Sequence, residues 1–154
     1  MENSFNYAEW KKRILALRQR HTRREDLEFC ELVECVDRIN DIDIIRTLLE
    51  TFTPKCETSV QQTVVRILGS FDILLYYQAY LEALPRFVFE NSGWDIELGS
   101  YPERSPTGVE IGLIAKMVNN LPLEIKNMYL NVLKNDDFYS DHSWSESLIR
   151  AIEG

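Results

Sequence analysis

Apolar residues recur every three to four positions along almost the whole chain. This spacing brings them onto one face of an α-helix. The first such stripe runs from Tyr7 to Leu17 and the last from Trp144 to Ile152. Glycine and proline are sparse, which disfavours a turn-rich all-β fold. The sequence therefore predicts an all-α protein with about eight helices.

The predicted helices are joined by short links, which make successive helices antiparallel neighbours. Three pairs are expected to form helical hairpins: residues 25–39 with 41–52, 54–68 with 70–89, and 109–120 with 122–134. We expect these hairpins to stack as a short α-solenoid, and an irregular helical bundle remains the alternative. At 154 residues, the chain is expected to form a single helical domain, 1–154.

Several residues mark where the predicted helices begin and end. The dipeptide Asn40-Asp41 offers a cap for the third helix, and Thr53-Pro54 resembles an N-cap followed by proline at the first helical position. Gly69 is expected in the left-handed conformation that closes the fourth helix. Pro85 should kink or end the fifth helix, which is apolar on two sides and therefore central.

The segment 91–108 interrupts the helical pattern. It is rich in turn-forming residues and holds two large aromatic residues among acids. Long loops inside compact domains are often functional. The residues that attract attention are Trp94, Asp95, Glu97, Tyr101 and Glu103.

Charge is distributed unevenly along the chain. The net charge is −8, yet the first 24 residues carry seven basic and two acidic side chains. The remainder is therefore strongly acidic, and it should attract cationic partners and repel nucleic acid and anionic membranes. We expect the basic opening helix to face acids of the protein itself or of a partner rather than nucleic acid.

The sequence also gives expectations about location. The first 13 residues lack the apolar core of a secretory signal. The most apolar window, 71–89, is interrupted by polar residues and predicts a core helix rather than a membrane span. Three cysteines without a signal peptide indicate reduced thiols. We therefore expect a cytoplasmic protein.

Motifs for catalysis, metal binding and phosphate binding are missing from the sequence. The two histidines, His21 and His142, lack the spaced partners of a catalytic relay. Glu28, Glu31 and Glu34 follow one helix face, but the Glu-x-x-His pairs of diiron bundles are absent. We expect no enzyme activity, no cofactor and no metal site, so this face is either solvated or a docking surface.

Three stretches carry a family resemblance: FDILLYYQAYLEALPRF, GLIAKMVNN and LPLEIKNMYLNVLKN. The matching positions are Tyr80, Leu81, Ala83 and Leu84, then Ile114 to Asn120, then Tyr129, Leu130, Leu133 and Lys134. With these residues, the segment 71–151 resembles the immunity protein 30 family. Those are small helical proteins encoded beside toxins of bacterial contact-dependent and polymorphic inhibition systems. The resemblance implies binding and neutralisation of a cognate toxin without catalysis, and it transfers no site residues.

The first functional hypothesis is an immunity protein that binds a cationic toxin C-terminal domain, a nuclease, and blocks it. The expected contacts are the loop residues Trp94, Asp95, Glu97, Tyr101 and Glu103, with exposed aromatic anchors, followed by Glu28, Glu31 and Glu34. A helical-repeat adaptor in another assembly is the alternative. An enzyme that uses paired carboxylates is the weakest hypothesis.

Overall fold

The computed structural model describes residues 5–56 and 58–154, and within these ranges it contains ten α-helices and no strand. The all-α prediction is confirmed. The eight expected segments are helical, and two short helices, α6 and α9, are additional. The helices are α1 Tyr7–Ala16, α2 Arg23–Glu34, α3 Ile42–Glu50, α4 Thr58–Leu68, α5 Ile73–Glu90, α6 Trp94–Glu97, α7 Gly108–Asn119, α8 Leu123–Lys134, α9 Asp136–Asp141 and α10 Trp144–Glu153.

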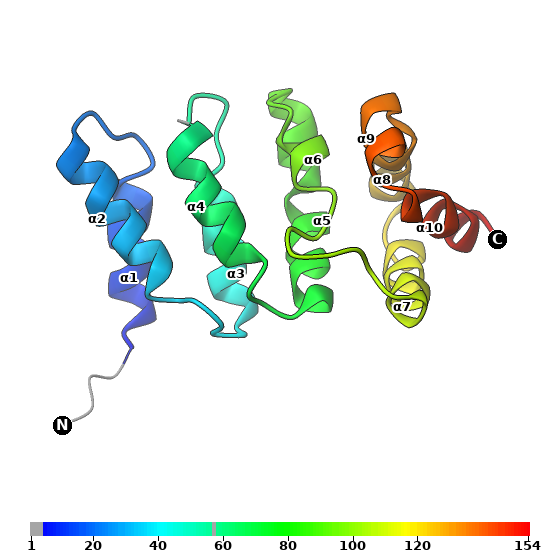
Figure 1. The fold of residues 1–154 in the computed structure, drawn as a ribbon, viewed down its shortest axis with the longest axis horizontal. Coiled ribbons are helices and arrows are strands. Elements are labelled where there is room, and N and C mark those ends of the chain that lie inside the picture. The colour runs from blue at the N-terminus through cyan, green and yellow to red at the C-terminus, as the bar shows by residue number, and fades with distance from the viewer. Residues whose placement is uncertain (1–4, 57) are drawn as a thin grey trace.

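The helices are arranged in rows (Figure 1). α1, α3 and α5 lie side by side in one row, and α2 and α4 lie in front of them, each packed on its predecessor in the chain. α7 and α8 follow α5, and α10 crosses both at the C-terminal end. The helices therefore pair as α1 with α2, α3 with α4 and α7 with α8.

Two of the three predicted hairpins are shifted by one helix. The segment 25–39 packs chiefly on α1 and α4 rather than on 41–52, and 54–68 packs chiefly on α2 and α3 rather than on 70–89. The third pair, 109–120 with 122–134, is confirmed as α7 packed on α8. A short link between two helices therefore did not determine whether they pack on each other or on other helices.

α5 is the central helix, as predicted, and it contacts α3, α6, α7 and α8. Pro85 does not end it, because the helix continues to Glu90. Arg86, directly after the proline, donates hydrogen bonds to the carbonyls of Leu49 (2.8 Å) and Phe52 (3.0 Å), in and just after the last turn of α3. These bonds fasten the last turns of α5 to its neighbour.

One predicted helix start is confirmed and another is wrong. The carboxylate of Asp41 accepts the N–H of Asp43 at 2.8 Å and caps α3, which confirms that prediction. The proposed start at Thr53-Pro54 is wrong, because α4 begins at Thr58. The chain turns first, with the Cys56 N–H bound to the Thr53 carbonyl at 3.2 Å.

Gly69 follows α4, but the prediction that it adopts the left-handed conformation is wrong. Its role is steric instead. A Cβ at this position would lie 3.3 Å from both the Cβ and the backbone N of Glu103, so the segment after α6 runs directly over the glycine. Close approach of a second backbone is the other common reason for glycine.

None of the helices in the described ranges has the length and apolarity needed to cross a lipid bilayer.

Candidate partner-binding surface

The two aromatic residues predicted to be exposed contacts are buried, so that expectation is wrong. Trp94 is 8% exposed; its Nε1 donates to the Thr53 carbonyl at 3.1 Å, and its ring meets Phe52 edge-on at 4.7 Å. Tyr101 is 6% exposed, and its hydroxyl donates to the carbonyls of Gly69 and Phe71. Burial raises the pKa of Tyr101 to about 12. Both residues fasten the loop to the core, because each polar group finds an acceptor there.

Buried tyrosines bind the backbone of the same loop from below. Tyr76 donates to the Leu98 carbonyl (2.6 Å) and Tyr80 to the Asp95 carbonyl (2.7 Å). Tyr129 of α8 donates to the Gly99 carbonyl at 3.2 Å. Burial raises the pKa of all three hydroxyls well above the ordinary value, so they remain neutral donors. The loop backbone is thereby anchored at 95–99.

The predicted loop acids keep contact with solvent. Asp95 is half-buried and Glu97 is exposed, both on α6, and the described residues offer neither carboxylate an ion-pair partner. Gly99 follows α6 and lies against α9. A Cβ there would stand 2.7 Å from Val132 Cγ1 and 3.1 Å from the Phe138 ring. The segment directly after α6 therefore packs on α8 and α9, and α6 and α9 both lie toward the same end of the helices (Figure 1).

α9 carries an acidic group that the sequence analysis missed. Asp136, Asp137 and Asp141 are exposed, and none has an ion-pair partner within the described chain. Between them, Tyr139 is 44% exposed. The signal was the run DDFYSD, whose six residues are too short for a helical stripe. We call Asp95, Glu97, Asp136, Asp137, Asp141 and Tyr139 the acidic end.

A second exposed aromatic lies at this end of the molecule. Phe89 belongs to the last turn of α5, directly before α6, and is 90% exposed. Its side chain therefore gains little from the fold and leaves apolar area available to a partner.

The remaining predicted acids lie elsewhere. Glu28 binds Arg13 of α1 at 3.1 Å, Glu34 binds Arg66 of α4 at 3.0 Å, and Glu31 is exposed. Glu103 is exposed and shares with Arg66 the wall of a hollow of about 570 Å³. Arg66 thus offsets the charge of Glu34, whereas Glu103 forms no ion pair with it.

The basic opening segment partly meets the protein's own acids, as expected. Besides Arg13, Arg20 binds Asp26 at 2.9 Å while its guanidinium stacks over the Phe29 ring at 4.0 Å. Arg20 is almost fully buried as a side chain, so its role is structural.

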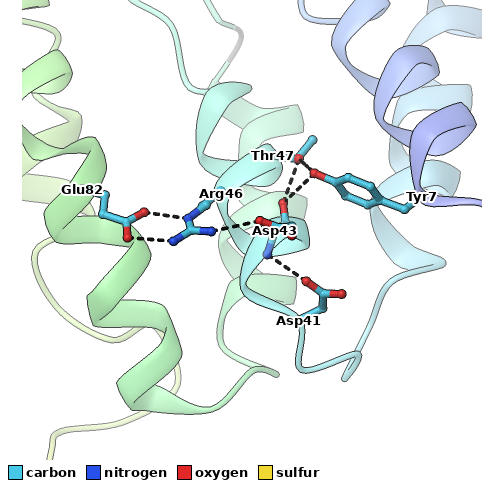
Figure 2. Close-up of polar contacts among 6 residues, drawn as sticks. All are labelled: Tyr7, Asp41, Asp43, Arg46, Thr47 and Glu82. Carbon is cyan, nitrogen blue, oxygen red and sulfur yellow. Dashed lines mark hydrogen bonds and ion pairs between the residues drawn. The ribbon is translucent and has the colours of Figure 1, made fainter.

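Another polar cluster ties three helices together (Figure 2). Arg46 of α3 grips both carboxylate oxygens of Glu82 on α5 (2.6 and 2.8 Å) and reaches Asp43 at 2.9 Å. The two carboxylates raise the pKa of the guanidinium, and the Glu82 hydrogen bonds contribute most. Tyr7 of α1 joins the cluster by a 2.9 Å hydrogen bond to Thr47.

This cluster borders a cavity of about 520 Å³ between α3 and α5. Arg86 and Glu90 line the same cavity and bind each other at 2.9 Å. Its charges are thus largely paired among themselves, which fits a connection between helices better than a site for chemistry.

Within the described residues, no group of three or more His, Cys, Asp or Glu side chains is placed to hold a metal ion. His142 contacts the rings of Phe138 and Trp144, with centroids 4.5 and 5.6 Å away. This histidine packs between α9 and α10.

Comparisons with known protein families, with curated proteins and with solved structures find no match for this chain.

Proposed function

We propose that this chain is an immunity protein, which binds a cognate toxin C-terminal domain and neutralises it without catalysis of its own. One observation carries the proposal: the acidic end presents five carboxylates without ion-pair partners among the described residues, together with the exposed Tyr139 of α9. Such a surface attracts a cationic protein, as a nuclease domain is, and speeds its association. The Tyr139 ring supplies apolar contact area beside the carboxylates of α9.

The family resemblance supports the same proposal. The stretches that resemble immunity protein 30 cover most of α5, α7 and α8. These helices supply Tyr76, Tyr80 and Tyr129, which bind the α6 loop and so position the two acids that α6 contributes to the acidic end. A nuclease toxin acts on nucleic acid inside the cell, so the proposal includes a cytoplasmic location.

The pairing of helices supports a finer description of the fold, a short α-solenoid of stacked helical hairpins. Solenoids offer extended surfaces for other proteins, because each hairpin adds a strip to a continuous face. This feature equally favours the second candidate, a helical-repeat adaptor. The gene immediately upstream separates the two, since an adaptor is not expected directly after the toxic C-terminus of a large secreted protein.

The direct test is co-expression with the toxin domain encoded upstream, with cell survival as the readout. We expect the wild-type chain to restore growth. Unchanged killing, with the chain soluble and folded by circular dichroism, contradicts the proposal.

The same assay tests the surface. Tyr139→Ala should reduce protection, because it removes the exposed ring from the acidic end. Val109→Ala is the matched control, since Val109 is 76% exposed at the start of α7. Equal protection by both variants argues against the acidic end as the contact surface.

A further inference from the structure

The two ends of the row of helices differ in how they are covered. At the C-terminal end, α10 places Trp144, Leu148 and Ile152 against α7 and α8 and bears a Glu146–Arg150 ion pair on its exposed side. At the other end, no described helix packs on the outer side of α1 and α2. Stacked helical arrays need a polar outer face on each terminal unit. At the N-terminal end, the charged Glu9 and Arg13 share the surface with the exposed apolar side chains of Phe5 and Ile39.

A groove of about 640 Å³ lies between α1 and α2 at the uncovered end. Its floor is apolar: Trp10 is 4% and Leu32 7% exposed, and the Trp10 Nε1 donates to the Leu32 carbonyl at 2.8 Å. Its rim leaves apolar area in solvent, with Phe5 44% and Ile39 38% exposed and the Cys35 thiol alongside.

The groove carries one acidic and one basic residue of α1, so its charges can complement those of a second copy of the same groove. Glu9 and Arg13 both line it and stand one helical turn apart on α1. The Glu9 carboxylate has no ion-pair partner among the described residues, and Arg13 holds Glu28 while half-exposed. When two copies of α1 run antiparallel about an axis midway between these residues, each Glu9 faces the Arg13 of the second copy. The pattern therefore favours another copy of this chain as the occupant.

We propose that the groove between α1 and α2 is the interface of a symmetric homodimer, in which Phe5, Cys35 and Ile39 of both copies become buried. The patch is small compared with obligate dimer interfaces, so the dimer is reversible and its population depends on concentration. The α1–α2 interface and α9 lie at opposite ends of the row of helices (Figure 1), so the dimer leaves the acidic end free.

Sedimentation equilibrium of the full chain over a range of concentrations tests the dimer. Arg13→Glu places like charges opposite each other and should raise the dimer dissociation constant roughly tenfold, since two symmetric pairs change sign. The double variant Glu9→Arg with Arg13→Glu restores opposite charges across the axis and should restore dimerisation. If the single variant leaves the dimer dissociation constant unchanged, or if the double variant still dimerises weakly, the proposed pairing is wrong.

Apolar contact is tested separately. Ile39→Glu should abolish the dimer. Val109→Glu makes the same kind of change at an exposed position on α7 and should leave the dimer intact. Alkylation of Cys35 by N-ethylmaleimide should slow as concentration rises, while alkylation of the half-buried Cys56 should not. A chain that remains monomeric throughout, with a Cys35 rate independent of concentration, contradicts the proposal.

Discussion

Gly99 illustrates how a single residue positions a functional surface. It has space for no side chain, because Val132 and Phe138 stand where a Cβ would lie. Its carbonyl accepts the Tyr129 hydroxyl, so the chain is held both by contact and by a hydrogen bond. The sequence identified a glycine in a polar loop, but the residues that fill the space behind it are distant in the chain.

The substitution Gly99→Ala should destabilise the fold by about 1–3 kcal/mol, because the new methyl group overpacks against a stiff valine. Gly112 gives the matched control. It lies within α7 with nothing within 4 Å of a Cβ, so Gly112→Ala should stabilise the protein by about 0.5–1 kcal/mol. Urea unfolding measures both free energies, and effects of the same sign would contradict this account.

Trp94 and Tyr101 show why the predicted contacts were only half right. Their acidic neighbours Asp95 and Glu97 reach solvent as expected, but both rings turn inward. The deciding partners are the carbonyls of Thr53 and Gly69, which precede Trp94 and Tyr101 by 41 and 32 residues. Local sequence does not reveal such acceptors.

At the scale of elements, the cap of α3 could be predicted because Asp41 and the N–H it accepts are two residues apart. The α7 N-terminus has an equally local cap that the sequence analysis did not identify: Thr107 accepts the Glu110 N–H (3.2 Å), and Glu110 accepts the Thr107 N–H (2.8 Å). Arg104 adds a two-point contact to the same carboxylate, at 2.6 and 2.9 Å. The Arg104 hydrogen bonds, followed by that from Thr107, lower the pKa of Glu110 to about 2.

The lowered pKa of Glu110 predicts how the stability of the fold changes with pH. The ionised Glu110 carboxylate stabilises the folded chain above its ordinary pKa of 4.5, and that stabilisation is lost as the pH falls through about 2. Glu110→Gln should therefore cost about 1 kcal/mol at neutral pH, as loss of a capping interaction does. The difference from wild type should shrink progressively below pH 4.5.

Unfolding free energies measured between pH 7 and pH 2 check this prediction. Glu124→Gln is the control, because Glu124 lies in the first turn of α8 without a side-chain cap bond. A Glu110→Gln penalty that is constant with pH would rule out the ionised carboxylate as the source of the stability.

At the scale of the whole molecule, the sequence predicted the helical class and the uneven charge, but not where that charge gathers in space. The three exposed acids of α9 lie toward the same end of the helices as Asp95 and Glu97 of α6 (Figure 1), and the segment at Gly99 packs on α9 there. By contrast, two of the three acids predicted on α2 bind arginines of neighbouring helices. The hairpin register also required tertiary information, since every helix has two candidate partners in the chain.

The central claim is that the acidic end steers a cationic toxin domain to this chain. The most direct measurement is the association rate constant for the purified toxin domain encoded upstream, at low and high salt. The variant Asp136→Asn/Asp137→Asn/Asp141→Asn should lower that rate roughly tenfold at low salt, with a smaller effect at high salt. The control Glu28→Gln/Glu31→Gln/Glu34→Gln removes the same charge from α2 and should change the rate less than about twofold. Equal slowing by both variants would mean that net charge alone matters, and no slowing by the first would contradict the claim.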